Sequence, residues 1–165
     1  MTVTVAGTGS LTGVGAEAAR TGDSPVPGLQ VRRHGAGFSA QMTASADALS
    51  RVRALTVAVS EESGTGADLA QSAELVVSEL MGNVVEACPD TGIVLLLVEV
   101  SVTPSGVDVA VHDTVPGRPT RASHSLDSDE ATSGRGLLLL DLLCEEWTIP
   151  PSRLGKQIRC HLAAA

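Results

Sequence analysis

Two neighbouring runs of β-branched residues constrain the fold of this chain more than any other feature of its sequence. The first covers residues 93–102 and moves into apolar alternation from Val98, and the second alternates over residues 107–113. Alternation of this kind is typical of strands with one buried face, and residues 104–106 (PSG) supply a turn between them. We therefore predict a β-hairpin that ends at Asp113 and packs one face against helices.

Two amphipathic helices are expected before this hairpin. The first covers residues 45–59 and begins at Ser45, a residue type suited to the N-cap. The second follows Thr65, with Asp68 three residues later in a capping arrangement, and ends before Pro89. Its apolar stripe consists of Leu69, Ala73, Val76, Leu80 and Val84.

After the hairpin, a polar stretch at residues 114–133 leads into an apolar helix at 134–143. Two short strands around Trp147 and Ile158 follow, joined by a turn at residues 150–155. The order of elements does not alternate as βαβ units do. It predicts an α+β fold, a two-layer sandwich with a mixed, largely antiparallel sheet.

Residues 1–37 are rich in Gly, Thr, Ala and Pro and show no sustained period. We predict a flexible arm there, followed by one domain at residues 38–165. The composition is 43% hydrophobic and 18% charged, which suffices for a packed core. With Phe38 and Trp147 as the only aromatic residues, that core must consist of Leu, Val, Ile and Ala.

The formal charge of -8 argues against nucleic acid as a direct partner, because phosphate binding needs clustered basic residues. The longest apolar run, residues 93–98, is too short to cross a membrane, and no signal peptide is indicated. Cys88, Cys144 and Cys160 fit neither a disulfide framework nor a zinc site of paired cysteines. These features favour a cytoplasmic protein.

Three groups of polar residues are candidates for chemistry. Glu79 and Asn83 lie four residues apart on the second helix, so a proton acceptor and an oxygen ligand for Mg²⁺ project from one side. Asp113 ends a strand where the sheet opens into a loop. The alternatives are a solvent-facing polar pair and an Asp that initiates a turn.

The third group precedes the apolar helix and consists of Ser133, Gly134, Arg135, Gly136 and Leu137. Free backbone amides at a helix N-terminus favour an anion such as a phosphate. A glycine turn that merely begins the helix is the alternative. Each group is weak evidence alone, but their order along the chain matches the parts of one nucleotide site.

Over residues 38–162 the chain resembles the GHKL (Bergerat-fold) ATPase domain, in the anti-sigma-factor serine kinase type of actinobacteria. Residues 74–87 (ELVVSELMGNVVEA) look like its N box, 109–119 (VAVHDTVPGRP) like its first glycine box, and 133–147 (SGRGLLLLDLLCEEW) like its second. Residues 154–162 (LGKQIRCHL) are similar to its terminal GK and strand.

This resemblance implies that the chain binds ATP and Mg²⁺. By analogy, Glu79 is the general base, Asn83 the Mg²⁺ ligand and Asp113 the acceptor of the adenine amino group. Residues 133–137 form the phosphate-binding end of the lid. The implied activity is a protein serine/threonine kinase that phosphorylates an antagonist protein on Ser.

The implied partners are a sigma factor or another transcription regulator and its antagonist, with a homodimer left open. The alternative is a non-catalytic adaptor of a transcription regulator, with or without bound nucleotide. Two departures from the family pattern support this alternative. Val115 replaces a small residue two places after Asp113, and no basic residue follows the N box at residues 86–88.

Overall fold

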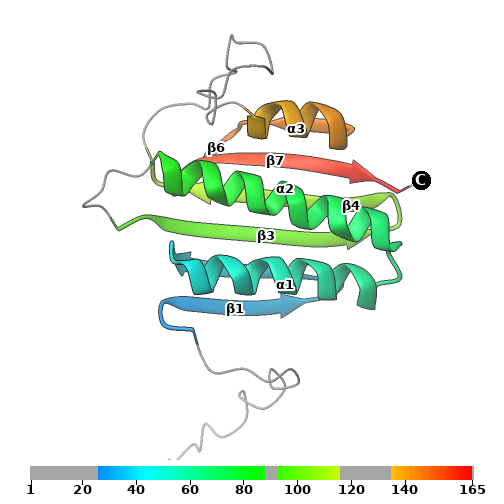
Figure 1. Cartoon of the computed structure of the whole chain (residues 1–165), viewed down its shortest axis with the longest axis horizontal. Coiled ribbons are helices and arrows are strands. Elements are labelled where there is room, and N and C mark those ends of the chain that lie inside the picture. The colour runs from blue at the N-terminus through cyan, green and yellow to red at the C-terminus, as the bar shows by residue number, and fades with distance from the viewer. Residues whose placement is uncertain (1–25, 88–92, 116–134, 165) are drawn as a thin grey trace, which may run out of the picture.

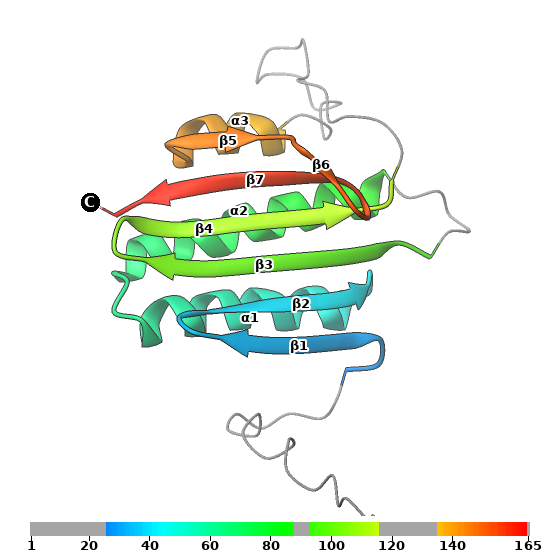
Figure 2. The same ribbon diagram turned by 180° about the vertical axis from the view of Figure 1, so that it is seen from behind.

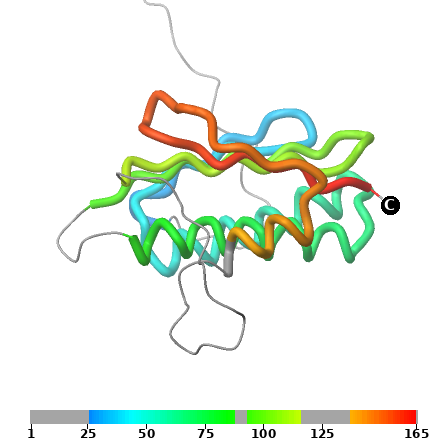
Figure 3. The backbone as a smooth tube through the Cα atoms, turned by 90° about the horizontal axis from the view of Figure 1, so that it is seen from above, coloured from blue at the N-terminus to red at the C-terminus, as the bar shows by residue number. Residues whose placement is uncertain are grey.

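A computed structural model of the chain describes residues 26–87, 93–115 and 135–164. Their helices cover one face of an antiparallel sheet, as Figures 1 and 3 show. The elements in chain order are β1 (Leu29–His34), β2 (Gly37–Thr43), α1 (Ala46–Glu62), α2 (Ala67–Glu86), β3 (Leu95–Thr103), β4 (Gly106–Asp113), α3 (Arg135–Leu143), β5 (Glu146–Thr148), β6 (Pro151–Ser152) and β7 (Gly155–Ala163). The predicted two-layer α+β sandwich is therefore confirmed.

The sheet has seven strands in the order β1-β2-β3-β4-β7-β5, with β6 paired to β7. Each strand pairing within the described residues is antiparallel, so the mixed character expected of the sheet is not seen there. Figure 2 shows the face that the helices leave uncovered. This topology places β4 and β7, which are far apart in sequence, side by side at the centre of the sheet.

The two predicted helices form, with one change at a cap. Ser45 caps α1, because its hydroxyl accepts a hydrogen bond from the Ala48 amide at 3.3 Å. The N-cap of α2 is Gly66 rather than Thr65, and it makes no side-chain capping bond. The capping prediction for Thr65 is wrong because its amide donates to the Ser60 carbonyl at 3.0 Å, in the turn that ends α1.

The N-terminal boundary also differs from the prediction, because β1 and β2 form a hairpin ahead of α1. Residues 29–37 thus belong to the sheet rather than to an arm, and residues 1–25 lie outside the described part of the chain. β1 is an edge strand whose residues are mostly exposed, so it carries little apolar alternation. β2 buries Phe38, Ala40 and Met42, and such a short alternation is a weak signal.

The hydrophobic core lies between the helices and the inner face of the sheet. The predicted hairpin β3–β4 supplies its centre, with the inward side chains Leu96, Val98, Val100, Val107, Val109 and Val111. Helix α3 adds Leu137 and Leu140, and Trp147 packs against the edge of this core. Among the described residues, none of the helices is both long enough and apolar enough to cross a membrane.

Candidate functional site

Helix α2, which carries Glu79 and Asn83, contacts both of the other elements that carry predicted site residues. Figure 1 shows α2 running back along the sheet toward the end of β4 and the start of β7, at the left of that view. Helix α2 packs against β4, β7 and α3. The helix of Glu79 and Asn83 thus packs against the strand that ends at Asp113 and against α3, although these elements are far apart in the sequence.

Glu79 and Asn83 lie on α2 beside its buried stripe, and both side chains are partly exposed. Neither side chain makes a hydrogen bond or an ion pair with another described residue. A carboxylate and an amide one turn apart are thus free to contact a ligand at the end of the helix. The arrangement agrees with a proton acceptor beside an oxygen ligand for a hard cation.

Asp113 is buried at the end of β4, and its carboxylate is paired with Lys156 on β7. The Lys156 ammonium lies 2.7 Å from Asp113 Oδ1, and the side chains are 18% and 3% exposed. The Val115 amide donates to the same oxygen at 2.8 Å, and Lys156 also donates to the Val115 carbonyl. These three residues form a closed hydrogen-bonded ring where the chain leaves the sheet.

No role of Lys156 follows from the sequence, although the Gly-Lys pair is part of the C-terminal motif. The contact depends on the register of β4 and β7, which places Asp113 directly opposite Lys156. A signal was nevertheless present, since Lys156 is the only lysine in the chain. A single ammonium on the inner face of a strand needs a buried acceptor.

The open oxygen of Asp113 tests whether the site fits an adenine base. Both bonds to this carboxylate reach Oδ1, and Oδ2 has no hydrogen bond within the described residues. The free oxygen of a carboxylate that is 3% exposed can accept a hydrogen bond from a ligand, and the amino group of adenine is such a donor. The residues present at this end of the sheet therefore fit an adenine nucleotide.

Val115, which the sequence suggested could crowd a purine, packs its side chain against the hydrophobic core. Its backbone holds the Asp113 turn.

At α3, Arg135 and Gly136 are the first two helical residues, whereas Ser133 and Gly134 lie outside the described residues. The Leu137 side chain is buried in the core, so a contact of this residue with phosphate would come from its backbone.

The uncovered face of the sheet carries polar pairs of a different kind. His112 Nε2 lies 2.9 Å from Glu99 and its Nδ1 lies 3.0 Å from Ser152, which confirms that His112 and Asp113 point to opposite faces. His161 Nδ1 lies 2.8 Å from Asp108, and this hydrogen bond raises the pKa of His161 above its usual value.

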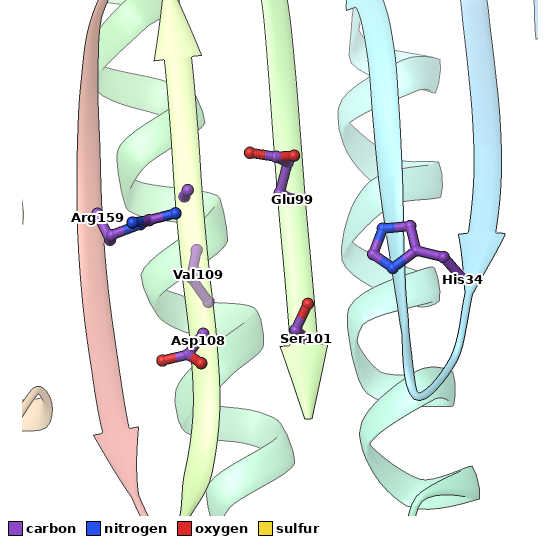
Figure 4. Close-up of a pocket in the computed structure, with 7 residues that line it drawn as sticks. His34, Glu99, Ser101, Asp108, Val109 and Arg159 are labelled. Atoms are coloured by element: carbon purple, nitrogen blue, oxygen red, sulfur yellow. The ribbon is translucent and has the colours of Figure 1, made fainter. Parts of the chain in front are cut away.

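Figure 4 shows the shallow hollow on this outer face, of about 340 Å³. Its polar lining includes His34, Glu99, Asp108 and Arg159, which come from four strands. Charges of both signs line it, and several of these side chains already have partners. The Glu99 and Asp108 carboxylates of the hollow are 42% and 52% exposed, so they lack the burial that distinguishes the Asp113 carboxylate.

Cys144 and Cys160 are free thiols, and Cys88 lies outside the described residues. The Cys160 thiol donates a hydrogen bond to Cys144. This bond and the burial of Cys160 raise the pKa of Cys160. The same bond lowers the pKa of Cys144. No group of His, Cys, Asp and Glu within the described ranges could hold a metal ion.

Comparison with protein families identifies the class of this domain. The model of the histidine kinase-like ATPase domain matches residues 42–161, so the chain belongs to that family. The match confirms the GHKL-type resemblance and makes this an ATP-binding domain of regulatory type. A comparison with curated proteins gave no significant match.

Proposed function

We propose that this protein is an ATP-dependent serine kinase that controls a transcription regulator by phosphorylating an antagonist protein. The observation that carries the proposal is the carboxylate of Asp113, which is 3% exposed and keeps Oδ2 open at the end of β4, a strand that packs against the helix of Glu79 and Asn83. Family membership supports ATP binding. The motif resemblance to anti-sigma-factor kinases supports serine as the acceptor and a sigma factor or similar regulator as the partner.

Each residue has a separate task in this proposal. Asp113 Oδ2 accepts a hydrogen bond from the adenine amino group, and the backbone amides that begin α3 face the phosphates. Asn83 would hold Mg²⁺, and ATP supplies the phosphoryl group. Glu79 takes the proton from the attacking serine hydroxyl. Positioning and charge neutralisation account for most of the acceleration in phosphoryl transfer, so this small set of groups is sufficient.

The first experiment is calorimetric titration of the protein with ATP, with and without Mg²⁺. Binding that strengthens with Mg²⁺ supports the site, and no binding in either condition contradicts it. Asn83→Ala should weaken chiefly the Mg²⁺-dependent part of the affinity. Glu79→Gln should leave Mg·ATP binding nearly unchanged, because the proposal does not use Glu79 to hold the nucleotide.

Phosphate transfer to a candidate antagonist, followed by mass spectrometry, separates catalysis from binding. Glu79→Gln should slow the labelling of Ser by about 10² to 10⁴, the usual contribution of a general base. Glu86→Gln makes the same chemical change at an exposed position in the last turn of α2 and should label at the wild-type rate. Equal rates for Glu79→Gln and wild type would remove Glu79 from catalysis.

A non-catalytic adaptor is the second candidate, and one observation favours it. The last turn of α2 carries no basic residue, and Glu86 and Ala87 are exposed there. The helix thus ends without a cation that could assist charge neutralisation at the phosphates. ATP binding without labelling of any antagonist would support the adaptor over the kinase.

A further inference from the structure

Lys156 occupies its buried position because of the way β7 begins. The inward side chains of this strand after Lys156 are Ile158, Cys160 and Leu162, and all three are buried. Since side chains alternate along a strand, Lys156 points to the same inner face. The methylene groups of Lys156 extend the row of inward apolar side chains on β7, and its ammonium reaches the end of β4.

Gly155 permits this close approach of the two strands. Its φ of +144° lies in a region that favours glycine, and a Cβ at this position would lie 2.7 Å from the Asp113 carbonyl oxygen. The Gly-Lys pair therefore works as a unit. Glycine brings the strand against the Asp113 turn, and lysine then occupies the position opposite the carboxylate.

The ring of hydrogen bonds determines which atom of Asp113 can meet a ligand. Lys156 and the Val115 amide both donate to Oδ1, so this oxygen is occupied and the carboxylate cannot rotate without losing two bonds. Oδ2 is left to accept. The ammonium also compensates the charge of a side chain that is only 3% exposed. The two oxygens therefore differ, since Oδ1 is already paired and Oδ2 can accept from a ligand.

That difference matters for the choice of purine. Adenine presents an amino group at carbon 6, which donates, whereas guanine presents a carbonyl oxygen, which accepts. An ionised carboxylate only accepts, so it binds the amino group and repels the carbonyl. An Asp113 that is not held in this orientation would discriminate less between the two bases.

We propose that Lys156 is the positioning residue that sets purine selectivity, by holding Asp113 as an oriented acceptor for the adenine amino group. This inference rests on the proposed ATP binding and adds to it a residue and a specificity. Lys156 acts through Asp113, so its removal should change the discrimination between purines rather than weaken every nucleotide equally.

The test compares three triphosphates by calorimetry: ATP, GTP and the triphosphate of purine riboside, which has no substituent at carbon 6. A hydrogen bond to a charged group corresponds to about tenfold to a hundredfold in affinity, so wild type should prefer ATP to the other two by about that factor. In Lys156→Met, the affinity for ATP should fall about tenfold, while the affinity for purine riboside triphosphate should change little. The ratio of ATP to GTP affinity should fall accordingly.

Arg159→Met is the matched control, because it removes a cation from the same strand on the exposed outer face. It should retain the wild-type ratio. Equal losses of all three nucleotides in Lys156→Met would show a structural role alone and overturn the inference, as would an unchanged ratio. Wild-type binding of ATP without preference over GTP would overturn the inference and leave ATP binding intact. Failure of wild type to bind any nucleotide would contradict the proposed function as well.

A second measurement uses the unmodified sequence, in case Lys156→Met does not fold. Because the chain has one lysine, labelling with lysine enriched in ¹³C at Cε gives one side-chain signal without further assignment. This signal should shift on addition of ATP, since the base binds at the partner of Lys156, and should stay in place with tripolyphosphate. An unchanged signal at saturating ATP would overturn the inference.

Discussion

Strand β4 carries one aspartate on each face of the sheet, and the two behave differently. Asp113 faces the helices, is 3% exposed and pairs with Lys156, whereas Asp108 faces outward, is 52% exposed and pairs with His161. Water solvates the outer carboxylate and weakens its ion pair. The inner carboxylate depends on protein donors, which makes it costly to disturb.

The same contrast extends over the two faces as a whole. The inner face is almost entirely apolar, so the single pair Asp113 and Lys156 stands out within it. The outer face carries a network in which His112 links Glu99 and Ser152. Polar groups are thus common on the exposed face, where their desolvation costs little, and rare on the buried face, where it costs much. The position of a polar group therefore indicates function better than its chemical type.

The largest expected effect comes from Asp113→Asn. This substitution leaves the mostly buried ammonium of Lys156 without its counter-charge. We expect the free energy of unfolding to fall by about 3 kcal/mol. This value is at the lower end for a broken buried ion pair, because Asn keeps one acceptor oxygen. Asp108→Asn makes the same change on the outer face and should cost less than about 1 kcal/mol. Urea denaturation of both variants measures the difference, and similar losses would abolish the distinction between the faces.

The next effect concerns the approach of β7 to the inner site. Gly155→Ala adds a Cβ 2.7 Å from the Asp113 carbonyl oxygen at a φ of +144°, so it should destabilise by about 1 to 3 kcal/mol. Gly82→Ala is the control, because a Cβ added at this position in α2 would have no atom within 4 Å other than those of the adjacent residues and the local helix backbone. That change should stabilise by about 0.5 to 1 kcal/mol in the same denaturation assay. A change in the free energy of unfolding with the same sign in both variants would contradict this explanation.

A smaller effect is expected in the outer network. Ser152→Ala removes the partner of His112 Nδ1 and the acceptor of the Leu154 amide, and should cost about 1 kcal/mol. Ser50→Ala, at an exposed position in α1, should change the melting temperature little or raise it slightly. A loss as large as that of Asp113→Asn would mean that the outer face also contains an energetically critical group.

The smallest effect depends on pH. Asp108 raises the pKa of His161, so protonated His161 stabilises the fold fully below the unfolded value of about 6.5. This contribution disappears as pH rises through the raised pKa. His161→Asn should therefore lower the free energy of unfolding by about 0.2 to 1 kcal/mol at pH 6. At pH 9 the substitution should have little effect. Denaturation measured at the two pH values checks this. A cost that grows with pH would have the wrong sign.

The sequence by itself determined the elements whose periodicity is strong. The alternation around Val98 and Val109, the stripe of α2 and the leucines of α3 each required one type of structure, because only that structure buries their apolar side chains together. The family motifs likewise predict one site that contains Glu79, Asn83 and Asp113. The exposed edge strand β1 left no such signal, since few of its side chains enter the core.

Only the tertiary structure decided how Asp113 is held. Lys156 follows it by 43 residues, and the pairing of β4 with β7 brings the two side chains to 2.7 Å. Local sequence contains the glycine and the lysine but not the register that joins them to the carboxylate. Register is set by the burial of whole strand faces, so the partner of a buried charge emerges when the sheet assembles.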